Sequence, residues 1–260
     1  MRSVKIKEVI DALERFAPLP LQEEYDNAGL QVGLTEAEVS GALLCLDVTE
    51  RVVDEAITKG CNLIVAHHPL IFRKLSQVTD ANYVQRTVIK AIKNDIVIVA
   101  MHTNLDAAFG GVNFKIAEKL RLRDVRFFGR EKVVTNPLTD KKVTGGDGVI
   151  GCFDTPLAAD DLILLLKKEF DVECVQANEL LRREIRTVAL CGGSGSFLLQ
   201  DAINAGADAF ITGEMGYHEF FGHEQEIQLC VIGHYQSEQY TTEVLQIGGA
   251  SCRERVFRAV

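Results

Sequence analysis

Tryptophan, paired cysteine motifs and long apolar runs are all missing from this 260-residue chain. No uninterrupted apolar stretch approaches the ~20 residues needed to cross a bilayer, so we expect no membrane span. The seven cysteines form no CxxC pair, and several lie inside apolar runs such as ALLCLDV. An odd, unpatterned set of this kind predicts reduced thiols in the core of a cytoplasmic protein.

Several signatures of catalysis and targeting are missing as well. No GxSxG nucleophile elbow occurs, and the cysteines show no nucleophile pattern. The first 16 residues place apolar side chains on one helical face, and the lysines and glutamates between them interrupt what a signal peptide would keep apolar. The net charge of -9 argues against broad binding to a nucleic acid backbone.

What the chain does contain is an alternation of short β-rich apolar runs with amphipathic helical stretches. This alternation predicts an α/β fold with two lobes, each a mixed, largely parallel sheet flanked by helices. We expect residues 1–125 and 228–260 to form the first lobe and residues 126–227 to form the second. The segment 135–148 has the turn chemistry of a domain boundary or a long hairpin.

An internal repeat is one interpretation of this pattern. Sliding the chain against itself by 146 positions aligns two strand–helix–strand units, with Cys45 on Cys191, Ala56 on Ala202, Ile57 on Ile203 and Gly60 on Gly206. Four identities also fit a generic likeness, because helices of such units commonly end in glycine. Duplication and generic likeness both stay open.

Two adjacent histidines, His67 and His68, end a predicted buried strand in AHHPLIF. Ligands collect at the carboxyl ends of strands in open α/β sheets, and in the following turn both imidazoles can face one cleft. The next strand ends in HTNLD and brings His102 and Asp106 to the same edge of the sheet. Without these partners, the HH pair would be interpreted as the polar cap of a strand.

A second histidine–acid pair lies in VIGHYQSE near the end of the chain. If HYQSE opens a helix, His234 and Glu238 lie one turn apart and can chelate one centre. Two divalent ions would carry four positive charges, and Asp106 with Glu238 would carry two negative charges. The resulting site would have a net positive charge and could bind an anionic substrate. Paired ions of this kind lower the pKa of bound water towards ~7, the chemistry of hydrolysis. Such ligands suit zinc, iron, manganese, cobalt or nickel.

Three further segments each allow two interpretations. The loop 24–33 either folds over the site or is a surface loop. The turn 191–196, CGGSGS, either holds a phosphate or is a plain tight turn, since it lacks a Walker lysine and the full GxGxxG spacing. Glu214 and His218 either form an acid and base pair, or cap a helix and lie on its surface.

At this point the chain resembles the Nif-three-like family, whose motifs DNAGLQVG, LDVT, HHPLIF, HTNLD, GGSG, TGE and GHYQSE occur here in the same order. Bacterial members are often labelled GTP cyclohydrolase type 2-like. The resemblance implies two α/β lobes, a dinuclear metal centre at their interface and a ring-shaped homohexamer. It implies metal ligands at the five positions that the spacing also selects, namely His67, His68, Asp106, His234 and Glu238.

The resemblance does not specify the roles of two residues, His102 and Tyr25. His102 either binds metal or orients the ligands by hydrogen bonding. Tyr25 stands where the family often carries tryptophan, and we expect that exchange to affect packing more than chemistry.

Two functions follow from these expectations. The first is a metal-dependent hydrolase of a nucleotide-like or phosphorylated small molecule, with Glu214 or His218 as proton carrier and His102 beside the ions. In that case the first lobe carries all the metal ligands and the second closes the site. The alternative is a metal-binding scaffold or regulatory ring without turnover. Binding of nucleic acid is a weaker third hypothesis, because it would need a basic face that the composition does not show.

Overall fold

The computed structural model describes residues 3–248 and 257–259. The chain folds into two compact units. The first unit comprises the segments Met1–Ala108, Val134–Val143 and Thr241–Val260. The second comprises Phe109–Val133 and Thr144–Tyr240. Each unit has its own sheet and its own buried apolar cluster, in agreement with the predicted two-lobed α/β class.

The first unit contains a five-stranded sheet with the order β1-β4-β3-β2-β11. All neighbouring strands are parallel except β1 and β4. Its strands are β1 (Gly29–Val32), β2 (Ala42–Cys45), β3 (Leu63–Ala66), β4 (Val97–Ala100) and β11 (Phe257–Ala259). Its helices are α1 (Ile6–Phe16), η1 (Leu19–Leu21), α2 (Glu50–Lys59), α3 (Tyr83–Lys93), α4 (Thr103–Asp106) and α9 (Thr241–Gly248).

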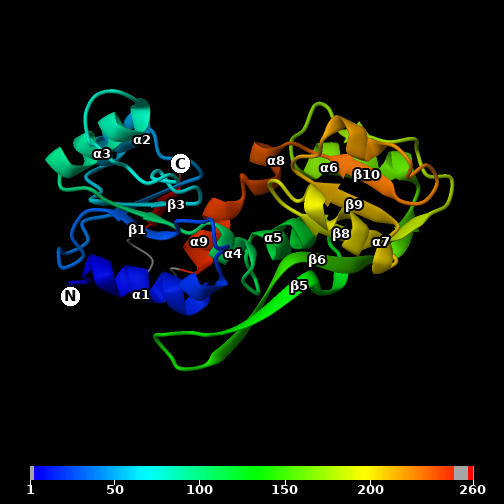
Figure 1. Cartoon of the computed structure of the whole chain (residues 1–260), viewed down its shortest axis with the longest axis horizontal. Coiled ribbons are helices and arrows are strands. Elements are labelled where there is room, and N and C mark those ends of the chain that lie inside the picture. Colours follow the sequence, from blue (N-terminus) through cyan, green and yellow to red (C-terminus); the bar gives the residue numbers. More distant parts are fainter. Residues whose placement is uncertain (1–2, 249–256, 260) are drawn as a thin grey trace. The chain divides into compact units, whose positions relative to one another are not determined.

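Helices cover both faces of this sheet, as Figure 1 shows with α2 and α3 above the strands and α1 below them. Every residue of β2, β3 and β4 is therefore buried, which explains why these strands are continuous apolar runs. Helix α2 begins at Thr49, whose side chain accepts a hydrogen bond from the Val52 N–H, and ends at Gly60 in the left-handed conformation.

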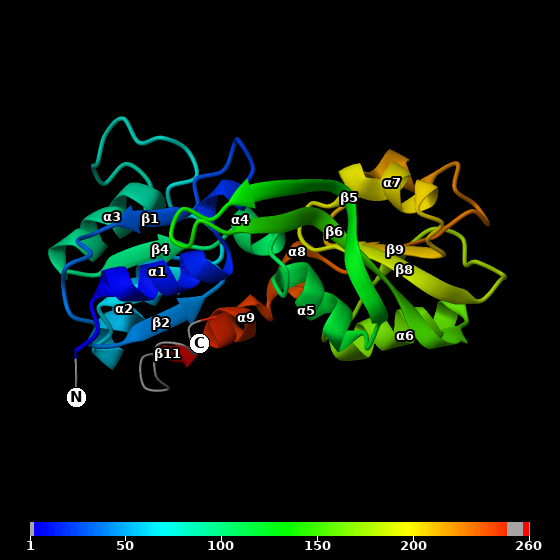
Figure 2. The ribbon, with the colours of Figure 1, turned by 90° about the horizontal axis from the view of Figure 1, so that it is seen from below.

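The second unit contains a six-stranded sheet with the order β5-β6-β8-β9-β10-β7. Its strands are β5 (Arg123–Thr135), β6 (Lys142–Leu157), β7 (Gln176–Ala177), β8 (Ile185–Cys191), β9 (Ala209–Thr212) and β10 (Gln228–Val231). Its helices are α5 (Val112–Lys119), α6 (Ala159–Glu169), η2 (Ser196–Leu198), α7 (Leu199–Asn204), η3 (Tyr217–Phe220) and α8 (His234–Glu238). Figure 2 shows α7 on one side of β8 and β9 and α6 on the other.

Only the centre of the second sheet is parallel. Strands β8, β9 and β10 run parallel, whereas β6 and β7 flank them in antiparallel pairing. The prediction of a largely parallel sheet thus describes the first unit better than the second. The segment 135–148, predicted to be a domain boundary or a long hairpin, has features of both. It joins β5 to β6, and the division between the units falls between Val143 and Thr144. At the tip of this hairpin, the buried amide of Asn136 donates to the carbonyl oxygens of Glu14 and Arg15.

The boundaries between the units differ from the predicted ones at three segments. Residues 109–125 and 228–240, which the sequence assigned to the first lobe, lie in the second unit, and residues 134–143, which it assigned to the second lobe, lie in the first. The reason for residues 228–240 is strand pairing: β10 pairs with β9 on one side and with β7 on the other. The apolar pattern predicts that a strand is buried but does not specify which sheet it joins. The histidine–acid pair on α8 therefore belongs to the second unit.

Both units contain successive parallel strands joined by helices, so the predicted internal repeat can be compared with the structure. A shift of 146 positions carries β2 onto residues 188–191 of β8 and β3 onto β9. Gly60 and Gly206, which end the intervening helices, have φ angles of 68° and 72°. The same shift carries β4 into α9 rather than onto a strand, so the correspondence is limited to one strand–helix–strand unit.

Six of the seven cysteines lie in the described ranges, and all six are free thiols. Burial raises the pKa of the Cys45 and Cys230 thiols to about 12, so neither is a reactive thiolate near neutral pH. Cys252 lies outside the described residues. Among residues 3–248 and 257–259, every helix is too short or too polar to cross a bilayer.

Candidate metal centre

Three histidines meet at the carboxyl edge of the first sheet. His67 and His68 directly follow β3, and His102 follows β4, its parallel neighbour. One ring nitrogen of each imidazole lies within 4.8 Å of those of the other two. The ring centroids are 4.9 to 5.4 Å apart. The convergence expected from strand order is therefore confirmed within the first unit.

Each of these imidazoles is held at Nδ1 by an oxygen acceptor. The pairs are His67 with the Met101 carbonyl at 2.8 Å, His68 with Asp47 at 2.9 Å and His102 with Asp26 at 2.8 Å. Carbonyl and carboxylate oxygens only accept, so Nδ1 carries the proton in each neutral ring and Nε2 keeps its lone pair. Metal-binding histidines in proteins are typically oriented in this way.

Asp106 adds a carboxylate to this group. It ends the short helix α4, one turn after His102, and its Oδ1 lies 3.6 Å from Nε2 of the fully buried His67. The His-x-x-x-acid spacing of the sequence thus places the acid beside the histidine of the neighbouring strand.

Asp26 lies in the loop 24–33 and fixes His102. Its side chain is fully buried and accepts hydrogen bonds from His102 and from both the N–H and the hydroxyl of Thr103. Burial acts to raise the pKa of Asp26, but the hydrogen bonds from His102 and Thr103 outweigh it and hold the pKa at about 2. The loop therefore belongs to the site, and its interpretation as a plain surface loop is wrong.

Asp47 is a second carboxylate to which the sequence assigned no role. It follows β2 in the LDVT motif and accepts from Nδ1 of His68. Its signal was available, because an acid directly after a buried parallel strand lies at the same sheet edge as the residues after β3 and β4. Asp26 offered no comparable signal, since it follows no strand.

The second unit carries the other histidine–acid pair. His234 and Glu238 begin and end α8, and His234 Nε2 lies 3.2 Å from Oε2 of the buried Glu238. The predicted one-turn separation on a helix is confirmed. His234 Nδ1 is 2.8 Å from Glu214 Oε1, so this imidazole is held like the three in the first unit. The hydrogen bond to Glu238, with that to Glu214, raises the pKa of His234 to about 9.

The CGGSGS turn packs directly against this pair. Gly193 has a φ of 59°, and a side chain there would collide with Glu238 Oε1 and approach Nε2 of His234. The amide of Gly193 donates to Ser237 Oγ, and that of Gly195 to Thr212 Oγ1. Because these amides already have partners within the protein, the structure favours a tight turn over a phosphate-binding loop.

Glu214 and His218 contact different residues in the structure. Glu214 accepts hydrogen bonds from Ser194 and His234, and the bond from Ser194 lowers its pKa. The cap of η3 is instead Glu219, which accepts from the Gly216 N–H. His218 lies exposed on η3, where its ring contacts those of Tyr217 and Phe221. Glu214 thus orients a candidate ligand, and no recorded contact joins His218 to the described candidate ligands.

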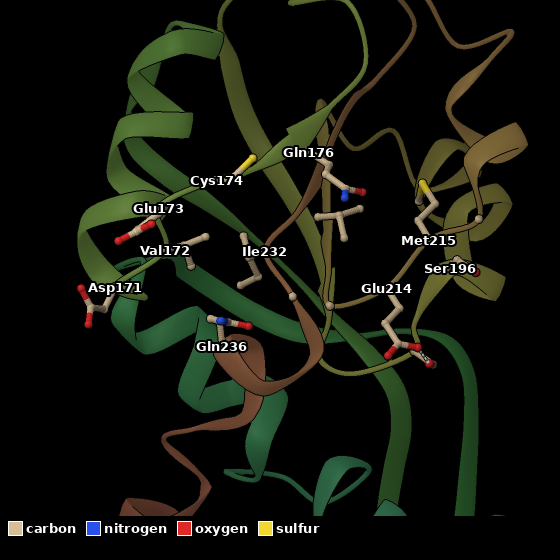
Figure 3. A pocket seen from close by; sticks show the side chains of 15 residues that line it. Asp171, Val172, Glu173, Cys174, Gln176, Ser196, Glu214, Met215, Ile232 and Gln236 are labelled. Atoms are coloured by element: carbon tan, nitrogen blue, oxygen red, sulfur yellow. Dashed lines mark hydrogen bonds between the residues drawn. The ribbon is translucent and has the colours of Figure 1, made fainter.

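A pocket of about 960 Å³ opens beside Glu214 in the second unit. Figure 3 shows Glu214, Met215 and Ser196 along one side and Asp171, Glu173 and Cys174 along the other. Its lining includes three carboxylates, those of Asp171, Glu173 and Glu214, but no lysine, arginine or histidine. A phosphate would be repelled here, whereas an uncharged group with N–H donors would find acceptors.

The donor set fits divalent transition metals. Imidazole nitrogens and carboxylate oxygens are the ligands that zinc, iron, manganese, cobalt and nickel share. In each imidazole Nδ1 faces an oxygen acceptor, so Nε2 is the nitrogen that could bind an ion; at His234 it would first have to give up its contact with Glu238. Fold and side chains thus define a two-unit α/β protein whose histidine and carboxylate groups could hold metal.

The family follows from comparison with known sequences. The family model described as Duf34/NIF3 (NGG1p interacting factor 3) matches residues 4–248. The chain belongs to this family. It is 33% identical over 239 residues to a GTP cyclohydrolase 1 type 2 homolog of Clostridium acetobutylicum, covering 91% of this chain and 86% of that protein. A protein of the same name from Clostridium perfringens is 35% identical over 237 residues, covering 90% and 87%.

Solved structures agree with this assignment. The Staphylococcus aureus hypothetical protein SA1388 matches with a TM-score of 0.88 and 27% identity, over 100% of this chain and 97% of that one. A Bacillus cereus protein related to NIF3 matches with a TM-score of 0.84 and 25% identity, over 100% and 97%. Reduced HcgD from Methanocaldococcus jannaschii shares the fold, with a TM-score of 0.79 and 22% identity over 100% and 98%.

Proposed function

We propose that the chain is a hydrolase that binds two divalent metal ions and acts on a nucleotide-like or phosphorylated small molecule. The ligands in this proposal are His67, His68, Asp106, His234 and Glu238. The observation that carries it is the common arrangement of four imidazoles, each held at Nδ1 by an oxygen acceptor. Metal-binding histidines are commonly oriented in this way. His223, which has no proposed ligand role, makes the same kind of contact with Glu226, so the proposal also depends on the convergence of His67, His68 and His102.

Each unit supplies its own candidate ligands. His67, His68 and Asp106 lie in the first unit, and His234 and Glu238 lie in the second. Two bound divalent ions supply an activated water near neutral pH and neutralise charge on an anionic substrate. In the second unit, Glu214 holds His234, and Gly193 leaves room for the His234–Glu238 pair. We assign His102 to the ion-binding group, because one of its ring nitrogens lies within 4.8 Å of those of His67 and His68.

The substrate class follows from charge. Four positive charges from two ions exceed the two negative charges of Asp106 and Glu238, so the anionic part of a substrate belongs at the ions. The acid-lined pocket beside Glu214 would repel that anionic part. A nucleotide is such an anion, in keeping with the name GTP cyclohydrolase 1 type 2 homolog that the curated relatives carry.

Metal analysis and an activity screen test this function together. Purified protein with metal restored should contain two ions per chain and hydrolyse at least one member of a nucleotide and phosphoester panel, including GTP. His68→Ala should lose that activity, whereas Tyr83→Ala, at an exposed position on α3, should keep it. Equal turnover by His68→Ala and the parent protein would refute the proposal.

The alternative is a metal-binding scaffold without turnover. Two tightly bound ions with no hydrolysis across the panel would support it. The homohexamer implied by the family resemblance stays a prediction, and measurement of the mass in solution tests it.

A further inference from the structure

Two exposed aromatic side chains lie beside the histidine cluster of the first unit. Tyr25 is 68% exposed and Phe72 is 46% exposed. Their ring centroids are 6.4 Å apart with an edge-to-face arrangement. The Phe72 ring also lies 6.2 Å from that of His102, at an interplanar angle of 87°. A continuous row of rings therefore runs outward from the three imidazoles to Tyr25.

Packing does not explain this pair. Neither ring belongs to the buried apolar cluster of the first unit or to the partly buried side chains packed against it. A single exposed aromatic residue is ordinary, but two in contact at the edge of a candidate metal centre mark a binding surface. The expectation that the exchange of tryptophan for Tyr25 affects packing more than chemistry stays a prediction.

The backbones that carry the two rings are fixed to the site. Asp26, next to Tyr25, is fully buried and bonded to His102 and Thr103. The side-chain amide of Asn27 donates to the Ile71 carbonyl at 2.6 Å, and the Ile71 N–H donates to Gln31 at 3.1 Å. These bonds connect Asn27, which precedes β1, and Gln31 of β1 to the loop after β3. The rings are thus preorganised, which lowers the entropic cost of binding a ligand.

The chemistry of a suitable ligand follows from the neighbours of the pair. Aromatic side chains stack on planar rings with little regard to their substituents. Arg73 and Lys74, both exposed, follow Phe72 directly and bring positive charge. A planar heterocycle that carries phosphate satisfies both features.

We infer that Tyr25 and Phe72 form an aromatic platform that binds the planar ring of a nucleotide-like ligand beside the histidine cluster. This inference rests on the proposed function in that it assigns residues to the recognition of its substrate. The platform determines which ligands bind, while His67, His68 and His102 belong to the ion-binding group.

The lack of tryptophan in the chain allows a direct binding measurement. Tyr25→Trp creates a protein with a single indole at the platform, and Tyr83→Trp creates the matched control at another exposed tyrosine, 56% exposed on α3. Both are titrated with guanosine 5′-monophosphate in the presence of a chelator. We expect saturable quenching at position 25 and only a linear absorbance effect at position 83. Ribose 5-phosphate, which lacks a planar ring, should not quench either protein.

A second substitution tests the other ring. Phe72→Leu in the Tyr25→Trp protein should weaken the binding of guanosine 5′-monophosphate by roughly tenfold, because it removes one stacking surface. Phe72→Tyr should retain the affinity. Unchanged affinity in Phe72→Leu, or saturable quenching of equal strength at position 83, overturns the platform.

Because these titrations contain no metal, they separate the two proposals. Saturable quenching of the indole at position 25, with no hydrolysis in any activity screen, supports the platform and contradicts only the hydrolase proposal. Hydrolysis with no saturable quenching at position 25 contradicts only the platform proposal.

Discussion

At the scale of single residues, Asp26 has more influence on the candidate centre than its position in a loop suggests. Asp26→Asn keeps the shape of the side chain but removes the charge that holds His102 Nδ1–H and the Thr103 hydroxyl. We expect metal affinity to fall about 10- to 100-fold, as is usual when a group that orients a ligand is lost. Isothermal titration of the metal-free protein measures this.

The control for that substitution is Asp95→Asn. Asp95 is exposed with a φ of 52°, a conformation that asparagine tolerates well, and it should bind metal as the parent does. Equal affinities in the two variants would show that Asp26 serves the loop alone.

The protonation of His234 predicts a pH dependence of metal binding. Hydrogen bonds to Glu238 and Glu214 raise its pKa to about 9 in the metal-free protein, so the imidazole is protonated at pH 7 and must release that proton to bind an ion. Affinity at this position should therefore rise by about tenfold per unit between pH 7 and pH 8.5 and level off above about 9. His234→Gln should flatten this dependence. A pH-independent affinity in the parent protein would contradict the proton competition.

The residues of the candidate centre were predictable from sequence to different degrees. His67, His68, His102 and Asp106 follow strands that the apolar pattern already locates, so their convergence could be expected. Asp26 could not, because its contact with His102 spans 76 positions and depends on how a loop folds. Sequence periodicity carries no information about such contacts.

At the scale of structural elements, the turn after β8 is the one most sensitive to substitution. Gly193→Ala forces a side chain into a left-handed conformation and against Glu238 and His234, whereas Gly206→Ala has the same conformational cost with no atom within 4 Å. Both variants should lose about 1 kcal/mol of unfolding free energy from the backbone alone. Only Gly193→Ala should also lose metal binding at α8. Thermal melting and metal analysis of the two variants measure this, and equal metal content would show that α8 tolerates the side chain.

The kinds of elements were predictable, but their partners were only partly so. The buried runs of β2, β3, β4, β8, β9 and β10 are short, continuous and apolar, and each is a strand. The sheet that β10 joins depends on its register with β9 and β7, which no local pattern encodes. The predicted mixed sheets allow antiparallel strands, but the pattern did not specify that β6 and β7 would be the antiparallel ones.

At the scale of the whole molecule, the proposed function predicts that bound metal stabilises the folded protein. Metal at 100 times its dissociation constant should add about 2.7 kcal/mol to the free energy of unfolding. Hydrogen exchange of the amides in β8, β9 and β10 should slow when metal is added to the parent protein, because His234 and Glu238 lie in the same unit as these strands. The protection should be smaller in His234→Gln. Full protection in that variant would show that His234 holds no ion.

Because the chain is synthesised from its amino terminus, the first sheet can be completed only after the second unit has been translated. Strands β2, β3 and β4 emerge from the ribosome early, but α9 packs on β2 and β11 pairs with it, and both come from the last 20 residues. The whole second unit is translated between β4 and α9. The edge of β2 that later pairs with β11 therefore stays unpaired while the second unit folds. The unit that begins first is therefore the last to be completed, and a ribosome stalled before residue 241 would display that open edge to chaperones.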